Sequence, residues 1–250
     1  MLRSASNEPS MYNKVTLETE VGTLYIVSTP IGNLKDITHR ALEMLNNVDL
    51  IAAEDTRRTG VLLKHYDVKT PLSSFNSYNQ VKKSDHFIAR LLKGQNLALV
   101  SDAGTPGVSD PLYYLVRAAL DESVSVVSLP GPSAVLGALT VSGLPVNRFV
   151  FEGFLPRKKG RKTFIENLAE EKRTIVLFES PYRLAKTLNE LYQVMGNRQA
   201  VLARELTKIY EEVLRGPLEE LMTIADKRKL KGEITIVIAG FSKKNINKGS

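Results

Sequence analysis

Short apolar runs rich in β-branched residues recur along the chain, and most of them are followed by a segment with helical spacing. Runs of this kind are typical of strands buried on both faces of a sheet, because strands with one solvated face alternate polar and apolar residues. The pattern therefore predicts an α/β architecture with mainly parallel pairing. The expected strands cover residues 23–29, 48–54, 96–102, 124–129, 148–154, 174–180, 199–205 and 234–240.

The segments between the expected strands of the first half have the spacing of helices. Asp36 is placed to cap a helix that runs through Asn46, and Thr56–His65 continues directly from the end of a strand. An apolar stripe that begins at Val81 stops at Gly94, a residue type that commonly ends helices. These helices would supply the crossover connections that parallel strands require.

One boundary is expected near the middle of the chain. A Pro-Gly-Pro turn at residues 130–132 is followed by a small-residue helix over 133–141, a Gly-Leu-Pro turn and a new set of strands. The halves have the usual size of domains. We expect a disordered lead-in over 1–21, an N-terminal α/β domain over 22–132, a C-terminal α/β domain over 133–241 and a tail over 242–250.

Composition narrows the available chemistry. The chain has no cysteine, which excludes a disulfide scaffold, a thiolate nucleophile and any cysteine-based metal site. With His39, His65 and His86 as its imidazoles, it is not expected to build an all-histidine metal site. The N-terminus is polar, and the Pro-Gly-Pro turn interrupts the uncharged stretch 123–147, so we expect a soluble cytoplasmic protein without a membrane span.

The net charge of +7 has two competing interpretations, a well-solvated surface or a polyanionic partner. Two basic clusters carry much of the excess. Such runs are typical of solvated loops, and they are equally what contact with a phosphate backbone requires. The first cluster is Arg157, Lys158, Lys159, Arg161 and Lys162, and the second is Lys227, Arg228, Lys229 and Lys231.

Several familiar signatures are absent from the sequence. It has no G-x-G-x-x-G after a strand and no G-x-x-x-x-G-K-[ST], so neither an ordinary Rossmann site nor a P-loop is expected. It also lacks H-E-x-x-H and G-x-S-x-G, which argues against zinc hydrolysis and elbow-serine chemistry.

Four turn-rich loops follow expected strands, at the edge where open α/β sheets bind ligands. The most distinctive is 101–111, where small residues would let the backbone approach a ligand and Asp102 and Thr105 supply polar groups. A purely structural loop of this length and composition would be unusual, so we favour a ligand-binding role. The other loops are 28–34, 54–58 and 130–134, and each also has a purely structural interpretation. Residues 28–34 could form an ordinary βα loop, the two acids of 54–58 could cap a helix, and Ser133 of 130–134 could be a simple N-cap.

Taken in order, these loops resemble one known family, that of ribosomal small-subunit methyltransferase I. The likeness covers about Gly22 to Gly240 and is carried by STPIGNLKDIT, AEDTRRT, SDAGTPGVSDP, PGPSA, FEGFLPRK, ESPYRL, ARELTKIYEE and KGEITIVIAG. It implies the tetrapyrrole-methylase fold, two α/β domains with S-adenosyl-L-methionine bound in the cleft between them. It implies 2′-O-methylation of a cytidine ribose in the decoding region of 16S rRNA, in the small ribosomal subunit, and a homodimer. With this partner, the polyanionic interpretation of the charge becomes the favoured one.

The resemblance also implies site residues. The cofactor-binding residues are expected to be Pro30, Ala103, Gly104, Val108, Ser133, Ala134, Phe178 and Glu233, and the RNA-binding residues Arg157, Lys158, Lys159, Arg161 and Lys162. The chain departs from the family pattern at Leu112, where the motif usually has glycine, and at Gln80, where it usually has glutamate. Many members also carry a further small helical domain after the segment that matches the end of this chain.

The reaction implied is methyl transfer from a sulfonium to a ribose hydroxyl, which needs alignment and removal of the hydroxyl proton but no metal. The candidate catalytic residues are Asp102 in the most distinctive loop, Lys208 as a lysine of lowered pKa, and Arg57 as a bidentate phosphate donor. Three glutamates at strand ends are alternatives for the proton acceptor: Glu54, Glu179 and Glu205.

Two other functions remain open on the sequence. One is an enzyme of the same fold that methylates a small molecule or a protein, and the other is a non-catalytic RNA-binding factor that has kept the fold. The basic cluster at residues 157–162 separates the first of these from an RNA methyltransferase, since a small substrate does not need it. Binding of S-adenosyl-L-methionine would distinguish a methyltransferase from the second, a non-catalytic RNA-binding factor.

Overall fold

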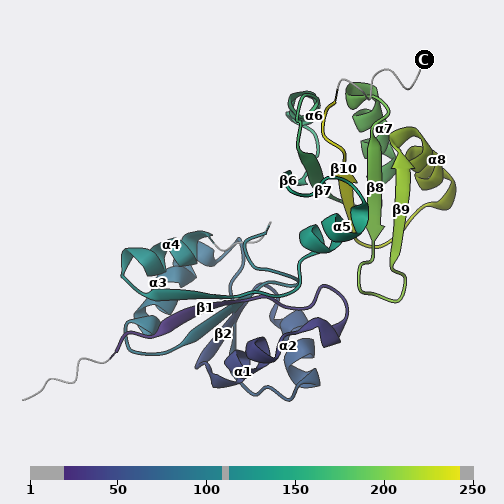
Figure 1. Cartoon of the computed structure of the whole chain (residues 1–250). Coiled ribbons are helices and arrows are strands. Elements are labelled where there is room, and N and C mark those ends of the chain that lie inside the picture. Colours follow the sequence, from purple (N-terminus) through teal and green to yellow (C-terminus); the bar gives the residue numbers. More distant parts are fainter. Residues whose placement is uncertain (1–19, 109–112, 243–250) are drawn as a thin grey trace, which may run out of the picture.

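The structure is a computed structural model that describes residues 20–108 and 113–242, and within these ranges it contains two five-stranded sheets. Figure 1 shows the two sheets, each with its own helices, as two bodies that are joined through the segment leading into α5. The predicted α/β fold is thereby confirmed.

The first sheet has the order β3-β2-β4-β1-β5, and all its pairings are parallel. Its strands are β1 (Thr23–Val27), β2 (Leu50–Ala53), β3 (Leu72–Ser74), β4 (Leu97–Val100) and β5 (Ser125–Leu129). The connecting elements are a 3-10 turn, η1 (Leu34–Asp36), and the helices α1 (His39–Asn47), α2 (Thr56–His65), α3 (Gln80–Leu91) and α4 (Tyr113–Asp121).

Helices cover both faces of the first sheet, α3 and α4 on one side and α1 and α2 on the other (Figure 1). Alternate residues of each strand point to opposite faces, so Ile26 packs with the α3–α4 side and Val27 with the α1–α2 side. Because both of their faces are covered, the strands β1, β2 and β4 read as continuous apolar runs.

The second sheet has the order β6-β7-β10-β8-β9 and is mixed. Only the β6–β7 pairing is parallel, whereas β10 runs antiparallel to β7 and β8, and β8 antiparallel to β9. Its strands are β6 (Phe149–Phe154), β7 (Thr174–Glu179), β8 (Gln199–Arg204), β9 (Glu212–Pro217) and β10 (Ile234–Ile238), and its helices are α5 (Ala134–Ser142), α6 (Arg161–Leu168), α7 (Leu184–Met195) and α8 (Leu218–Arg228).

Helix α5 packs on the second sheet. Val135, Ala138 and Leu139 form a buried cluster with residues of β7, β8 and β10, while α6, α7 and α8 supply the core on the opposite face. The predicted division into 22–132 and 133–241 stays a prediction, and we retain it as a proposal because α5 contributes its apolar face to the second sheet.

The structure corrects several predictions of detail. Mainly parallel pairing is confirmed for the first sheet and is wrong for the second. Helix α1 is capped by Thr38, whose hydroxyl accepts a hydrogen bond from the Ala41 N–H, and not by Asp36, which lies in η1. Strands β3 and β9 were not predicted, because their half-buried residues do not form apolar runs. The predicted lead-in and tail, as well as Leu112, lie almost wholly outside the described residues.

In the ranges that the structure describes, no helix combines the length and the apolar character that crossing a membrane requires.

Candidate active site

A cavity of about 530 Å³ lies where the ends of the two sheets face each other. On the first sheet it is lined from the carboxyl ends of β1, β2, β4 and β5. On the second it is lined from the carboxyl ends of β6 and β7 and the start of the antiparallel β10. Its lining residues are Ile31, Glu54, Arg58, Asp102, Ala103, Gly104, Thr105, Val108, Ser133, Ala134, Phe154, Phe178, Glu179, Ser180, Pro181, Gly232, Glu233, Ile234 and Thr235.

The turn after β4 is fixed to the turn after β1 by a short backbone ladder. Thr29 and Gly104 exchange two N–H···O bonds of 2.8 and 3.0 Å. Gly104 has φ +81°, and a Cβ on it would stand 3.2 Å from Ile31 Cγ2, so glycine suits both the conformation and the close approach. The Thr105 hydroxyl lies 3.0 Å from the Ser28 hydroxyl and donates to the Pro132 carbonyl at 3.2 Å, which ties three loops together at the cavity wall.

The amino end of α5 opens onto the same cavity. Ser133 is the N-cap and accepts from the Leu136 N–H at 3.5 Å, and Ala134 is the first helical residue. The backbone N–H groups of a first helical turn lack intrahelical partners, so this end favours a negatively charged group. Ser133 therefore both caps α5 and lines the cavity.

Glu54 and Asp102 bring two carboxyl groups together, because β2 and β4 are neighbouring parallel strands that end at the same edge. The Asp102 N–H donates to Glu54 Oε2 at 3.3 Å, and the Asp55 N–H donates to Asp102 Oδ1 at 2.9 Å. Burial raises the pKa of Glu54 above its ordinary value. The hydrogen bond from the Asp102 N–H lowers this pKa, and the negative charge of Asp102 raises it further. The raised pKa makes the Glu54 carboxylate a stronger proton acceptor than an ordinary glutamate.

The charged groups of the lining are mainly acidic. Glu54, Asp102, Glu179 and Glu233 contribute carboxyl groups, and Arg58 contributes a guanidinium. An opposite charge close to a ligand favours binding, so the cavity suits a ligand with net positive charge.

Lys208 does not have the lowered pKa that the sequence analysis expected. Its Nζ lies 3.0 Å from Glu205 Oε1 and 2.9 Å from Glu233 Oε2. Burial alone would lower the pKa of Lys208, but the hydrogen bonds and charges of the two glutamates raise it. The raised pKa argues against Lys208 as a proton acceptor, so its catalytic role stays a prediction, and its ammonium holds Glu233, which lines the cavity.

Arg57 is not among the residues that line the cavity, and its predicted role as a phosphate donor stays a prediction. Its guanidinium is exposed and donates to both oxygens of Asp55, at 3.1 and 2.7 Å, and these bonds hold the pKa of Asp55 well below its usual value. The neighbouring Arg58 faces the cavity and lies 3.2 Å from Asp102 Oδ2. Of the two arginines of AEDTRRT, Arg58 is therefore the one that lines the cavity.

Most of the predicted cofactor-binding residues come together in the cavity lining, along with Asp102. Those that line it are Ala103, Gly104, Val108, Ser133, Ala134, Phe178 and Glu233. Pro30 is not among the lining residues, whereas the adjacent Ile31 is. Arg58, Phe154 and Thr235 also line the cavity without having been predicted, although Phe154 lies within the FEGFLPRK motif and Thr235 within KGEIT.

The predicted RNA-binding residues divide into exposed and buried members. Arg157, Lys158, Lys159 and Lys162 are exposed at the start of α6. Arg161 is only 6% exposed, and its guanidinium donates to Glu190 Oε2 at 2.6 Å and to the Thr187 hydroxyl at 2.7 Å. Arg161 is not free to contact a phosphate while it holds these partners, which argues against its predicted role as an RNA-binding residue.

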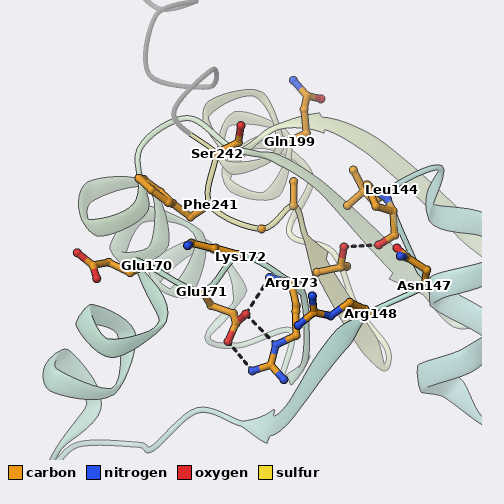
Figure 2. A pocket seen from close by; sticks show the side chains of 14 residues that line it. Leu144, Asn147, Arg148, Glu170, Glu171, Lys172, Arg173, Gln199, Phe241 and Ser242 are labelled. Carbon is orange, nitrogen blue, oxygen red and sulfur yellow. Dashed lines mark hydrogen bonds and ion pairs between the residues drawn. The ribbon is translucent and has the colours of Figure 1, made fainter.

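A larger cavity, about 720 Å³, lies at the opposite end of the second sheet, where β7 and β8 begin (Figure 2). Its walls carry Arg148, Lys172 and Arg173, and the Arg173 side chain is held by two hydrogen bonds to Glu171, of 2.9 and 2.7 Å. None of the predicted site residues lines it. Size alone therefore does not identify the active site. Among the described residues no group of three or more His, Asp or Glu is placed to hold a metal ion.

Comparison with known proteins shows the class of protein to which the chain belongs. The family model described as "Tetrapyrrole (Corrin/Porphyrin) Methylases" matches residues 23–222. The chain therefore belongs to the tetrapyrrole methylase family.

Within this class, similar relatives are named "Ribosomal RNA small subunit methyltransferase I". The relative from Thermotoga maritima is 50% identical over 220 residues, which cover 88% of this chain and 99% of the relative. The relative from Escherichia coli O157:H7 is 48% identical over 223 residues, covering 88% of this chain and 78% of the relative. These identities place the chain in the same family as the ribosomal RNA small subunit methyltransferase I proteins.

Solved structures share the fold at lower sequence identity. A diphthine synthase aligns with TM-score 0.67 and 18% identity, covering 87% of this chain and 90% of that one. A cobalt precorrin-4 methyltransferase aligns with TM-score 0.62 and 18% identity, covering 87% and 94%. The fold of this chain is thus shared with both solved structures.

Proposed function

We propose that the chain transfers a methyl group from S-adenosyl-L-methionine to the 2′-hydroxyl of a cytidine ribose in the decoding region of 16S rRNA, within the small ribosomal subunit. Methyltransferases of this family use S-adenosyl-L-methionine as methyl donor. The observation that carries the proposal is the convergence of the SDAGTP, PGPSA, AEDTR and KGEIT motifs on one cavity between the two sheets. An enzyme with this substrate acts where small subunits are made, in the cytoplasm.

The cavity fits this donor in shape and charge. The small residues Ala103, Gly104 and Ala134 leave room beside the backbone, and the amino end of α5 suits a carboxylate. The acidic lining complements a cationic ligand. When bound, S-adenosyl-L-methionine supplies a methyl group made electrophilic by its sulfonium. Residues Ala103, Gly104, Ser133 and Glu233 would hold it.

Replacing Gly104 by alanine tests this placement. Because φ is +81° and the added Cβ would stand 3.2 Å from Ile31 Cγ2, we expect a loss of about 1–2 kcal/mol in folding stability and a clear loss of affinity for S-adenosyl-L-methionine by calorimetry. Gly60→Ala is the matched control, since Gly60 lies in α2 with nothing within 4 Å of a Cβ. Unchanged affinity in a folded Gly104→Ala protein would place the donor elsewhere.

Glu54 is our candidate for the group that accepts the ribose proton. It lines the cavity, its pKa is raised, and Asp102, held by Arg58 and the Asp55 N–H, fixes its position. Asp102 is then a positioning residue. Lys208 positions the other wall through Glu233.

Transfer of labelled methyl groups tests the whole proposal. With radiolabelled S-adenosyl-L-methionine, we expect incorporation into small subunits from cells that lack the modification. Incorporation into porphyrin-like compounds or a protein, with none into subunits, would favour the same-fold alternatives instead. No detectable binding of the donor would favour a non-catalytic RNA-binding factor.

The chain is also proposed to act as a homodimer. Strand β5 is an edge of the first sheet, and unlike its neighbours it exposes Ser125, Val127 and Ser128. Large apolar side chains are exposed nearby in sequence, Leu120 at 57% and Leu136 at 55%. We expect sedimentation at twice the 27.7 kDa chain mass and a shift toward monomer in Val127→Glu. A monomeric wild-type protein at micromolar concentration would contradict the dimer.

A further inference from the structure

A second hollow, of about 400 Å³, lies between α6 and α7 and has a strongly basic lining. It is lined by Arg157, Lys158, Arg161, Lys162, Ile165, Lys186, Asn189, Glu190, Gln193 and Val194. Five of these residues are basic and Glu190 is acidic, so the lining has a formal charge of +4. We call it the α6–α7 groove.

We propose that the α6–α7 groove binds the phosphodiester backbone of the RNA, and that Lys186, Asn189 and Gln193 of α7 are binding residues together with the exposed cations Arg157, Lys158 and Lys162. This inference rests on the proposed function, since it assigns part of the substrate to a place on this chain. The new element is the face of α7, which lies beside the basic run at residues 157–162 and carries no basic cluster in the sequence.

The face of α7 is built from hydrogen-bond donors. Lys186, Asn189 and Gln193 are spaced by three and four residues, so they lie on one side of the helix and span roughly 10 Å along it. All three are exposed, and an ammonium and two amides present N–H groups that match phosphate oxygens. A surface of this length reaches beyond a single phosphate group.

The cations of the groove are only weakly engaged with the protein. Lys162 Nζ lies 3.8 Å from Glu166 and Lys186 Nζ 3.8 Å from Glu190, and these two lysine side chains are 83% and 70% exposed. Exposed ion pairs of this length contribute little, so phosphate can replace the carboxylates at low cost.

The buried Arg161 explains why the acidic residue does not repel phosphate. Its Nε donates to Glu190 Oε2 at 2.6 Å beneath the groove, which offsets the carboxylate charge. Arg161 also reaches the Thr187 hydroxyl and the Pro156 carbonyl, so it fixes α6 to α7. Its role is to hold the groove in shape.

The groove adjoins the cavity between the sheets. Phe154 lines the cavity and Arg157, three residues on, lines the groove; likewise Pro181 lines the cavity and Lys186, five residues on, lines the groove. Arg183 joins the two segments, since it lies 2.7 Å from the cavity residue Glu179 and donates to the Leu155 carbonyl at 3.2 Å. A strand whose ribose enters the cavity therefore passes the groove.

The test compares a Lys162→Gln/Lys186→Gln double variant with Lys93→Gln, an exposed lysine between α3 and the amino end of β4. Binding of a decoding-region 16S rRNA fragment is measured over a series of salt concentrations. The slope of log K against log[salt] should fall by about 0.7–0.9 for each phosphate contact removed. KM for small subunits should rise at unchanged kcat, with unchanged affinity for S-adenosyl-L-methionine.

An unchanged salt slope in the double variant, while the wild-type protein methylates RNA, would overturn the groove and leave the proposed function standing. Wild-type protein that binds the fragment with the expected slope but methylates no RNA would overturn the proposed function alone. Weakened binding to intact subunits with unaltered binding to the RNA fragment would point to a ribosomal protein and would contradict the groove as an RNA site.

Discussion

Glu54→Gln is expected to lower kcat for methyl transfer by a factor of about 10² to 10⁴ while leaving affinity for S-adenosyl-L-methionine nearly unchanged. The amide keeps the size of the side chain and can still accept the hydrogen bond from the Asp102 N–H, but it cannot take a proton. Single-turnover kinetics with labelled donor measure the rate, and calorimetry measures the affinity.

The pH dependence provides the sharper part of this experiment. Because burial raises the pKa of Glu54, the wild-type rate should fall as the pH is lowered through that raised value, where the carboxyl becomes protonated. The residual rate of Glu54→Gln should lack this acidic limb. Glu122→Gln, at an exposed position after α4, is the control and should retain both the rate and the limb. An acidic limb that persists unchanged in Glu54→Gln would show that another group accepts the proton.

Arg161→Met is expected to destabilise the protein by about 3–5 kcal/mol, because it removes the cation from a buried polar network and leaves carboxylates behind. Glu179 is 2% exposed, and its Oε2 lies 4.0 Å from the Arg161 guanidinium and accepts a hydrogen bond from the Thr187 hydroxyl, while its Oε1 pairs with Arg183. Denaturant unfolding followed by circular dichroism measures the loss.

The adjacent Lys162 provides the matched control for Arg161. Lys162→Gln alters an exposed side chain of the same helix and should change stability by no more than about 0.5 kcal/mol. Arg161→Lys is expected to recover only part of the loss, since one ammonium cannot replace a planar guanidinium that serves Glu190, Thr187 and Pro156 at once. Equal stability of Arg161→Met and the wild type would mean that the network is not structural.

The sequence predicts the apolar strands well because burial on both faces leaves a direct pattern. It does not reveal that β10 enters the second sheet antiparallel, since a strand with five buried residues reads the same in either direction. The half-buried β9 carries no such pattern, and the register of the β8–β9 hairpin decides where it pairs.

The candidate site is likewise predicted only in part by the sequence. Motif order identifies the loops that line the cavity, because those loops follow strands that end at one edge. Motifs do not tell which of two adjacent arginines turns inward: Arg57 is held by Asp55, whereas Arg58 reaches Asp102. Nor does a basic run reveal that helical spacing places Arg161 on the inner face of α6 and Lys162 on the outer one.

Mapping of 2′-O-methylation in the decoding region of 16S rRNA tests the central claim most directly. Cells with and without this protein are compared, and cells lacking it are complemented with the wild type or with Glu54→Gln. We expect one cytidine ribose to lose its methyl group without the protein, to regain it with the wild type and to stay unmethylated with Glu54→Gln. An identical methylation pattern in cells with and without the protein would contradict the account.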